Sequence, residues 1–145
     1  MKNIKKKLLF LCTGNSCRSQ MAEGWTRHLK GDIFEVFSAG VEAHGLDPIA
    51  VKVMAEAGVD ISGHRSKLVT ELLDQGIDYV VTVCDRAAEV CPRFPGKAKT
   101  THHSFQDPPA LAKNAKNEEE VLETYRRVRD EIRDFVKSLP EALEQ

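Results

Sequence analysis

Short strand-like runs alternate with segments of helical spacing along this chain, and this alternation constrains its fold more than any other feature. The first run, KKLLFL, is continuously apolar over 8–11 and ends at a loop that contains glycine, which is typical of a buried strand. Because strands and helices alternate, the pattern predicts an α/β fold with a three-layer, doubly wound, four-stranded parallel sheet. We expect strands over 4–11, 33–39, 77–83 and 97–105, and helices over 18–29, 47–57, 66–74, 85–90 and 114–138.

Local signals set several of these helix boundaries. Asp47 and Pro48 supply a cap and a first-turn proline, and Gly58 ends the helix that they begin. Pro92 is expected to end the short helix over 85–90. The last helix is charged but has one apolar face. The residues of that face are Val121, Leu122, Tyr125, Val128, Ile132, Phe135 and Val136.

Length and charge exclude several classes of function. We expect residues 1–145 to form a single domain, since a chain of 145 residues fits one domain with a proper core. The net charge of −1 argues against nucleic acid as a partner. The basic start, MKNIKKK, precedes an apolar run too short for a signal-peptide core or a membrane span. We therefore expect a cytoplasmic protein with no membrane partner.

The chain has four cysteines, Cys12, Cys17, Cys84 and Cys91. In a reducing cytosol such thiols are more often catalytic or metal-binding than paired in structural disulfides. No CxxC pair occurs and no histidine has zinc-finger spacing, so we expect no structural zinc. Free cysteine is also a common core residue, and this alternative stays open for Cys84 and Cys91.

The loop after the first expected strand has the composition of an anion cradle. A short loop between a strand and a helix can turn successive backbone N–H groups inward, and the helix adds its positive end. We expect this cradle to use Thr13, Gly14, Asn15, Ser16, Cys17 and Arg18.

Three side chains around that cradle suggest nucleophilic chemistry. Arg18 offers a planar fork for two oxygens of a tetrahedral oxyanion. Cys12 lies at the mouth of the positive field, which favours a thiolate, and Ser19 can donate its hydroxyl to that sulfur. The loop would bind an oxyanion and direct a nucleophile at its central atom. The alternative is a buried cysteine that ends a strand and an arginine that caps a surface.

Two further candidates follow other expected strands. Cys84 comes directly after the strand over 77–83, and Asp107 follows the strand over 97–105. Active sites of doubly wound sheets lie beyond the carboxyl ends of the strands, so these residues are expected near Cys12. Asp107 is a candidate general acid, although an Asp-Pro turn explains it as well. We expect His102 and His103 on the surface.

The pattern C-x5-R-S after the first strand resembles the low-molecular-weight protein tyrosine phosphatases. The string CTGNSCRSQMAEGW, with SAG at 38–40, EAHG at 42–45, VTVCDRAAEVCP at 81–92 and Asp-Pro at 107–108, is similar to arsenate reductases built on that phosphatase fold. The resemblance covers nearly the whole chain. It implies a phosphatase-like, flavodoxin-like topology and reduction of arsenate to arsenite, with phosphate or sulfate as analogues.

The resemblance also implies a role for each thiol. Cys12 attacks arsenic, Cys84 then forms a disulfide with Cys12, and Cys91 captures Cys84 by thiol–disulfide exchange. It further implies Asp107 as general acid, no metal or organic cofactor, a thioredoxin-type electron donor and a monomer. Glutaredoxin or mycothiol as donor stays open. The rival functions are a low-molecular-weight tyrosine phosphatase and a non-catalytic oxyanion-binding or redox-sensing protein.

Some reductases of this kind bind potassium near the loop. The matching positions here are Asn15, Glu23, Ser38 and Lys67, where the last holds a carboxylate in the potassium-binding members. A lysine ammonium cannot ligate a cation but could take its place. We therefore expect no potassium site in this chain.

Overall fold

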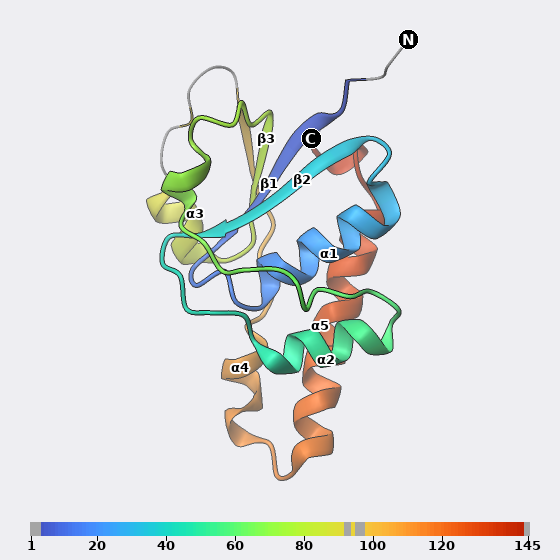
Figure 1. The fold of residues 1–145 in the computed structure, drawn as a ribbon. Coiled ribbons are helices and arrows are strands. Elements are labelled where there is room, and N and C mark those ends of the chain that lie inside the picture. Colours follow the sequence, from blue (N-terminus) through green and yellow to red (C-terminus); the bar gives the residue numbers. More distant parts are fainter. Residues whose placement is uncertain (1–3, 92–93, 95–97, 144–145) are drawn as a thin grey trace.

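The computed structural model describes residues 4–91, 94 and 98–143 and contains one parallel sheet (Figure 1). Its four strands run in the order β2-β1-β3-β4. Successive connections place β2 on one side of β1, and β3 and β4 on the other, which is the doubly wound arrangement that the sequence predicts. The strands are β1 (Lys6–Cys12), β2 (Phe34–Gly40), β3 (Tyr79–Thr82) and β4 (Lys99–His102).

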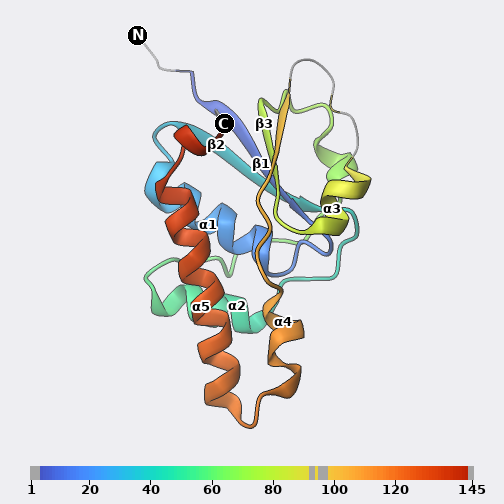
Figure 2. The same ribbon diagram turned by 180° about the vertical axis from the view of Figure 1, so that it is seen from behind.

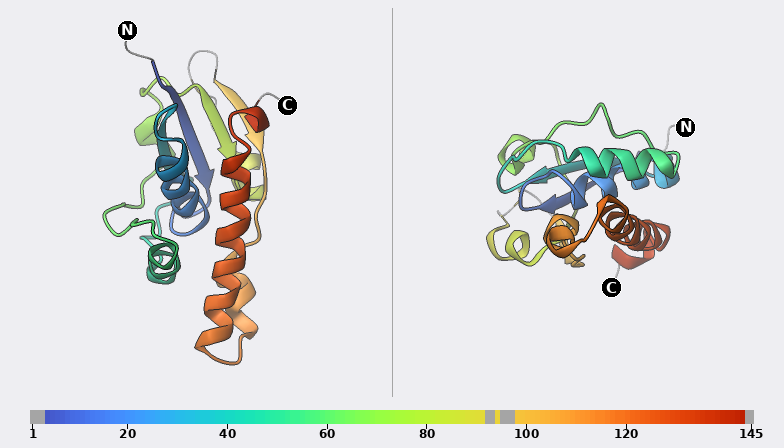
Figure 3. Two further views of the ribbon diagram at one scale, coloured as in Figure 1. Left: turned by 90° about the vertical axis from the view of Figure 1, so that its right-hand side faces the viewer. Right: turned by 90° about the horizontal axis from the view of Figure 1, so that it is seen from below.

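Helices cover both faces of this sheet. Viewed from either side, α1 and α5 lie together on one flank of the strands and α3 lies on the other (Figures 1 and 2). The lower part of α5 extends with α4 beyond the carboxyl edge of the sheet (Figure 3). The α-helices are α1 (Arg18–Lys30), α2 (Pro48–Glu56), α3 (Asp85–Val90), α4 (Pro108–Leu111) and α5 (Glu118–Lys137).

Three expected elements differ from the structure. The segment 66–74 forms only a 3-10 turn, Val69–Leu72, and the Glu71 carboxylate caps its start by accepting from the N–H of Leu68. The last helix begins at Glu118 rather than 114, since the Asn117 side chain caps it there. The fourth strand is shorter than predicted, and its expected start at 97 lies outside the described residues, as does the stop at Pro92.

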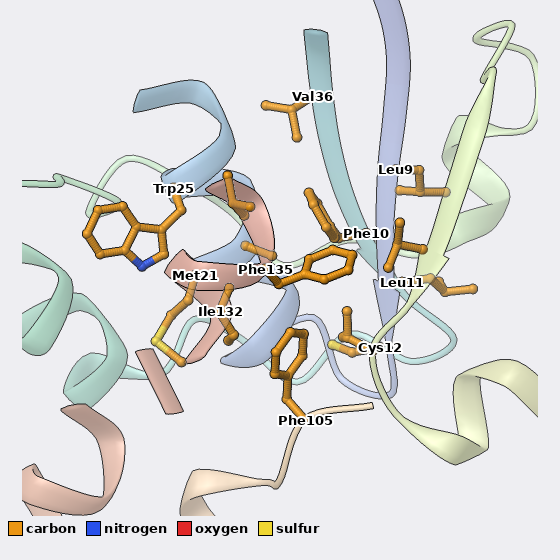
Figure 4. Close-up of a cluster of buried hydrophobic side chains, with 14 of the residues drawn as sticks. Leu9, Phe10, Leu11, Cys12, Met21, Trp25, Val36, Phe105, Ile132 and Phe135 are labelled. Atoms are coloured by element: carbon orange, nitrogen blue, oxygen red, sulfur yellow. The ribbon is translucent and has the colours of Figure 1, made fainter. Parts of the chain in front are cut away.

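The core forms because the side chains of β1 alternate between the two faces. Phe10 points toward Met21 of α1 and Phe135 of α5, while Leu9 and Leu11 lie on the opposite side of the strand (Figure 4). These residues are almost wholly buried, which explains why the run is continuously apolar. No helix among the described residues is both long and apolar enough to cross a membrane.

The topology brings two of the predicted thiols to one edge of the sheet. β1 and β3 are neighbours, with Leu11 paired to Thr82 and the N–H of Val83 bonded to the carbonyl of Leu11. Cys12 and Cys84 therefore leave adjacent parallel strands at the same end. This end is the switch point where doubly wound sheets bind ligands.

Candidate active site

The loop between β1 and α1 turns its carbonyl groups outward. Surrounding groups donate hydrogen bonds to every carbonyl from Cys12 to Cys17, and because each peptide is planar and trans, the next N–H points the opposite way. Six consecutive N–H groups, from Thr13 to Arg18, thus face the inside of the loop, where the N-terminus of α1 also points. The donors are the N–H groups of Val41, Glu42, His44, Asp47 and Met21, the Ser66 hydroxyl and the Gln20 amide.

Asn15 holds the shape of this loop. Its φ of +50° is unusual for a residue other than glycine, and the residue is fully buried. Its amide nitrogen donates to Ser19 Oγ at 2.8 Å and to Ser38 Oγ at 3.0 Å, and its amide oxygen accepts from Gln20 and from the N–H of Lys67. These four hydrogen bonds hold Asn15 in its uncommon backbone conformation, so the loop has its shape without a bound anion.

Gly14 is needed because the chain packs closely against it. The positive φ of this loop occurs at Asn15, not at Gly14. A Cβ at Gly14 would lie 2.8 Å from Cγ of His44, whose backbone N–H also bonds the Gly14 carbonyl. Glycine therefore gives the following loop room to pack directly on the cradle.

The sulfur of Cys12 lies in the mouth of the cradle among hydrogen-bond donors. Ser19 Oγ is 2.8 Å from it, and the backbone N–H of Asn15 donates to it at 3.2 Å. Both groups can donate to a thiolate at this position. The sequence-based pairing of Cys12 with Ser19 is therefore present in the structure.

Arg18 and Asp107 lie close together at the rim of the loop. Arg18 donates from Nη1 to the carbonyl of Phe105 at 3.0 Å, and its Nη2 lies 3.7 Å from Oδ1 of Asp107. The guanidinium side chain is 14% exposed and the carboxylate 42% exposed, so both can reach an anion at the loop. Two oxygens of a tetrahedral anion would find a bidentate partner here.

Cys84 also reaches the cradle. Its sulfur lies 3.3 Å from Oγ1 of Thr13, the residue next to Cys12, and the thiol is buried. Cys91 lies at the other end of α3, is half-buried, and has its pKa raised by that burial. The structure thus brings one of the two additional thiols to the loop and leaves the other at the far end of a helix.

Cys17 is a neutral core thiol. Burial raises its pKa well above the ordinary value, and the carboxylates of Asp47 and Asp107 raise it further. Its backbone contributes to the cradle while its side chain stays in the apolar interior.

The residues at the expected cation position do not fit potassium. The amide oxygen of Asn15 already accepts two hydrogen bonds, and Ser38 donates to Glu23 at 2.6 Å.

Arg27 pairs with Glu23 at 2.8 Å, whereas the ammonium of Lys67 bonds the carbonyl of Arg65 at 3.2 Å. The compensating charge therefore comes chiefly from Arg27, not from Lys67 as the sequence suggested. Among the described residues, no cluster of three His, Cys, Asp or Glu side chains could hold a metal.

Sequence reasoning missed several supports of the loop. The side-chain amide nitrogen of Gln20 donates to both the backbone carbonyl and the side-chain oxygen of Asn15. The side-chain amide oxygen of Gln20 contacts Nδ1 of His64. In the sequence, the only hint is that Gln20 directly precedes the apolar positions Met21 and Ala22 of the expected helix; its complete burial is visible only in the structure. Ser66 and the carbonyl of Phe105 carry no such signal, because their partners are 52 and 87 residues away.

Comparison with known proteins agrees with this geometry. Residues 7–145 match the family described as low molecular weight phosphotyrosine protein phosphatase. The chain belongs to this phosphatase family. The chain is 50% identical over 137 residues to a protein from Halalkalibacterium halodurans named arsenate reductase. The aligned region covers 94% of this chain and 96% of the relative.

Solved structures of the family share the fold. A structure described as an arsenate reductase in the phosphate binding state aligns with a TM-score of 0.72 and 31% identity, over 92% of this chain and 95% of that one. A thioredoxin-dependent arsenate reductase from Corynebacterium glutamicum aligns with a TM-score of 0.66 and 29% identity, over 100% of this chain and 66% of that one. The resemblance stated from the loop motif is thus confirmed.

Proposed function

We propose that this protein reduces arsenate to arsenite through three thiols, with electrons supplied by a thioredoxin-type donor. The observation that carries the proposal is the 3.3 Å contact between the Cys84 sulfur and Oγ1 of Thr13, because Thr13 is the loop residue that directly follows Cys12. A phosphatase that works through a phosphocysteine needs no second thiol. The name and 50% identity of the Halalkalibacterium halodurans relative support the same activity.

In the first step, the Cys12 thiolate attacks arsenic of an arsenate held by the loop N–H groups and Arg18. A sulfur–arsenic bond forms, one arsenic–oxygen bond breaks, and the departing oxygen leaves as water after accepting a proton. Asp107 is the acid that we assign to this proton, since it stands at the rim beside Arg18. Ser19 and the N–H of Asn15 stabilise the sulfur anion before attack.

In the second step, the Cys84 thiolate attacks the sulfur of Cys12. A disulfide forms between the two cysteines, the sulfur–arsenic bond breaks, and its electron pair goes to arsenic. Arsenic is reduced from the pentavalent to the trivalent state, and arsenite leaves. The two thiols together have lost two electrons.

In the third step, Cys91 attacks Cys84 and returns Cys12 as a thiolate. Cys84 and Cys91 are seven residues apart, which is about 10 Å along an intact helix. A disulfide requires Cα atoms within roughly 7 Å, so α3 must loosen. Loosening also removes the burial that raises the pKa of Cys91, which makes this thiol a better nucleophile when it is needed.

The loosened segment would carry the Cys84–Cys91 disulfide to the surface, where a thioredoxin-type dithiol reduces it. We expect the reaction to take place in a reducing compartment, with phosphate and sulfate as non-reducible analogues of the substrate. The protein needs no metal or organic cofactor for these steps, because all the electrons pass through sulfur.

A single assay tests the proposal and its rival. Purified protein with thioredoxin, its reductase and NADPH should release arsenite from arsenate, and Cys84→Ser should abolish this release. The rival function, a tyrosine phosphatase, predicts instead that Cys84→Ser keeps full activity on an aryl phosphate and that the parent protein releases no arsenite. Phosphatase activity is the natural rival because the family that the chain matches is described as a phosphotyrosine protein phosphatase.

A further inference from the structure

His102 is the last residue of β4, and both nitrogens of its ring have partners on other elements. Nδ1 lies 2.7 Å from the hydroxyl of Thr82, the last residue of β3. Nε2 lies 3.1 Å from Oδ1 of Asp85, the first residue of α3. The imidazole therefore joins the sheet to the first turn of the helix that follows Cys84.

The two ends of this connection differ in how firmly they are held. Thr82 is fully buried, and its backbone is in register with His102 and accepts a hydrogen bond from the N–H of His103. The side chain of Asp85 is 83% exposed. The contact with Thr82 is thus part of the sheet, whereas the contact with Asp85 can separate without disturbing any strand.

Cys84 lies between the two residues that the ring connects. The relay described under the proposed function moves Cys84 and loosens α3, so Asp85 must leave His102 when the disulfide forms. We propose, as an inference that rests on that relay, that His102 is a positioning residue that fastens the first turn of α3 in the dithiol form and releases it in the Cys84–Cys91 disulfide form.

A contact made in only one redox form stabilises that form. Loss of the His102–Asp85 contact should therefore favour the disulfide and make the reduction potential of the Cys84–Cys91 couple more negative. The pair is partly exposed, so the equilibrium constant should change about 2- to 5-fold. At 29.6 mV per tenfold change for a two-electron couple, this is a shift of about 10 to 20 mV.

The test measures this potential in a Cys12→Ser background, which leaves Cys84 and Cys91 as the reacting pair. The protein is equilibrated with dithiothreitol and its cyclic disulfide, to which the two thiols give two electrons and two protons. Acid quenching, alkylation and peptide mass spectrometry then give the fraction oxidised. The variants are His102→Ala, Asp85→Asn and their combination.

Two features of the design separate positioning from general effects. Asp85→Asn also removes a carboxylate from the start of a helix, so the coupling between the two substitutions, not either single shift, measures the contact. Glu89→Gln makes the same charge change at an exposed position of α3 and should leave the potential unchanged. His102→Gln keeps a polar group against Thr82 and replaces His102→Ala if that variant does not fold.

A non-additive shift toward negative potential in both single variants supports the role of His102. Additive shifts, or a potential in His102→Ala equal to that of the reference, would overturn it while leaving the relay intact. Failure of the reference protein to form any Cys84–Cys91 disulfide would overturn the relay itself, and with it this role of His102.

Discussion

The hydroxyl of Thr13 lies 3.3 Å from the sulfur of Cys84, although the two residues are 71 positions apart in the chain. This contact links the oxyanion loop to the start of α3. It follows from the neighbouring positions of β1 and β3, because Cys12 ends β1 and Cys84 follows the end of β3 at the same edge of the sheet.

Removal of this hydroxyl should slow the second chemical step more than the first. We expect Thr13→Val to bind arsenate normally, because the backbone N–H groups remain, but to release arsenite about tenfold more slowly in a single turnover. A hydrogen bond to a charged sulfur is worth about 1.5 kcal/mol or more, and each 1.4 kcal/mol is tenfold in rate. Thr13→Ser, which keeps the hydroxyl, should be close to the parent; equal rates in Thr13→Val and the parent would contradict the role.

Replacement of the nucleophile should separate binding from chemistry. Cys12→Ser is expected to abolish arsenate reduction and any weak hydrolysis of an aryl phosphate, since both require the sulfur. Phosphate binding, measured by calorimetry, should survive because the cradle and Arg18 are intact. Arg18→Ala is the matched control and should lose binding. Sustained arsenite release by Cys12→Ser would remove Cys12 from the reaction.

The end of β2 should tolerate no side chain. A Cβ at Gly40 would lie 2.7 Å from the carbonyl oxygen of Thr13 and 2.8 Å from the N–H nitrogen of Asn15, both backbone atoms of the cradle. Gly40→Ala should therefore lower stability by about 1–3 kcal/mol and weaken phosphate binding. Gly63→Ala, where a Cβ meets nothing within 4 Å, serves as the control in the same thermal and binding measurements. A Gly40→Ala protein as stable as this control would show that the loop shifts freely.

Potassium should have no specific effect. The oxygens of Asn15 and Ser38 are already engaged by protein donors, and Arg27 pairs with Glu23. Exchange of potassium for sodium at fixed ionic strength should leave the melting temperature and the rate unchanged. A melting temperature that rises with potassium alone, as mass action requires for a bound ion, would reveal a site.

Oxidation should loosen α3 selectively. Amide hydrogens of residues 88–90 should exchange faster in the Cys84–Cys91 disulfide form than in the dithiol form, while β3 (Tyr79–Thr82) keeps its protection. A Cys91→Ser variant should complete about one turnover and then stop as a Cys12–Cys84 disulfide. Equal protection of α3 in both redox forms would contradict the need for loosening.

The parts of this molecule that the sequence predicts are those set by local patterns. A continuous apolar run is sufficient to place β1 in the interior, and the spacing from Cys12 to Arg18 is sufficient to predict an anion loop. The segment 66–74 was predicted as a longer helix but forms only the 3-10 turn Val69–Leu72, because local helical spacing does not fix how far a helix extends without tertiary packing.

Contacts between distant residues account for what could not be predicted. Asparagine tolerates a positive φ, but the sequence does not show that Asn15 adopts one, because its side chain is held by Ser38 and the N–H of Lys67, 23 and 52 positions away. The need for glycine at position 14 has the same origin, since the side chain that a Cβ would meet, His44, comes from a different loop. The source of the charge that compensates Glu23 was misjudged, because Arg27 approaches Glu23 along a helix face that a comparison of matching positions ignores.

The outward-facing carbonyls of the cradle also determine what the protein can discriminate. A ring of backbone N–H groups and one guanidinium recognises shape and charge, and phosphate offers nearly the same shape and charge as arsenate. Selectivity must then arise after capture, because only arsenic accepts the electron pair of a sulfur bond. Phosphate would act as a competitive inhibitor, because it would bind in the same loop and leave unchanged. In the reduced protein, the fraction of bound anions that are reduced would accordingly follow the ratio of arsenate to phosphate.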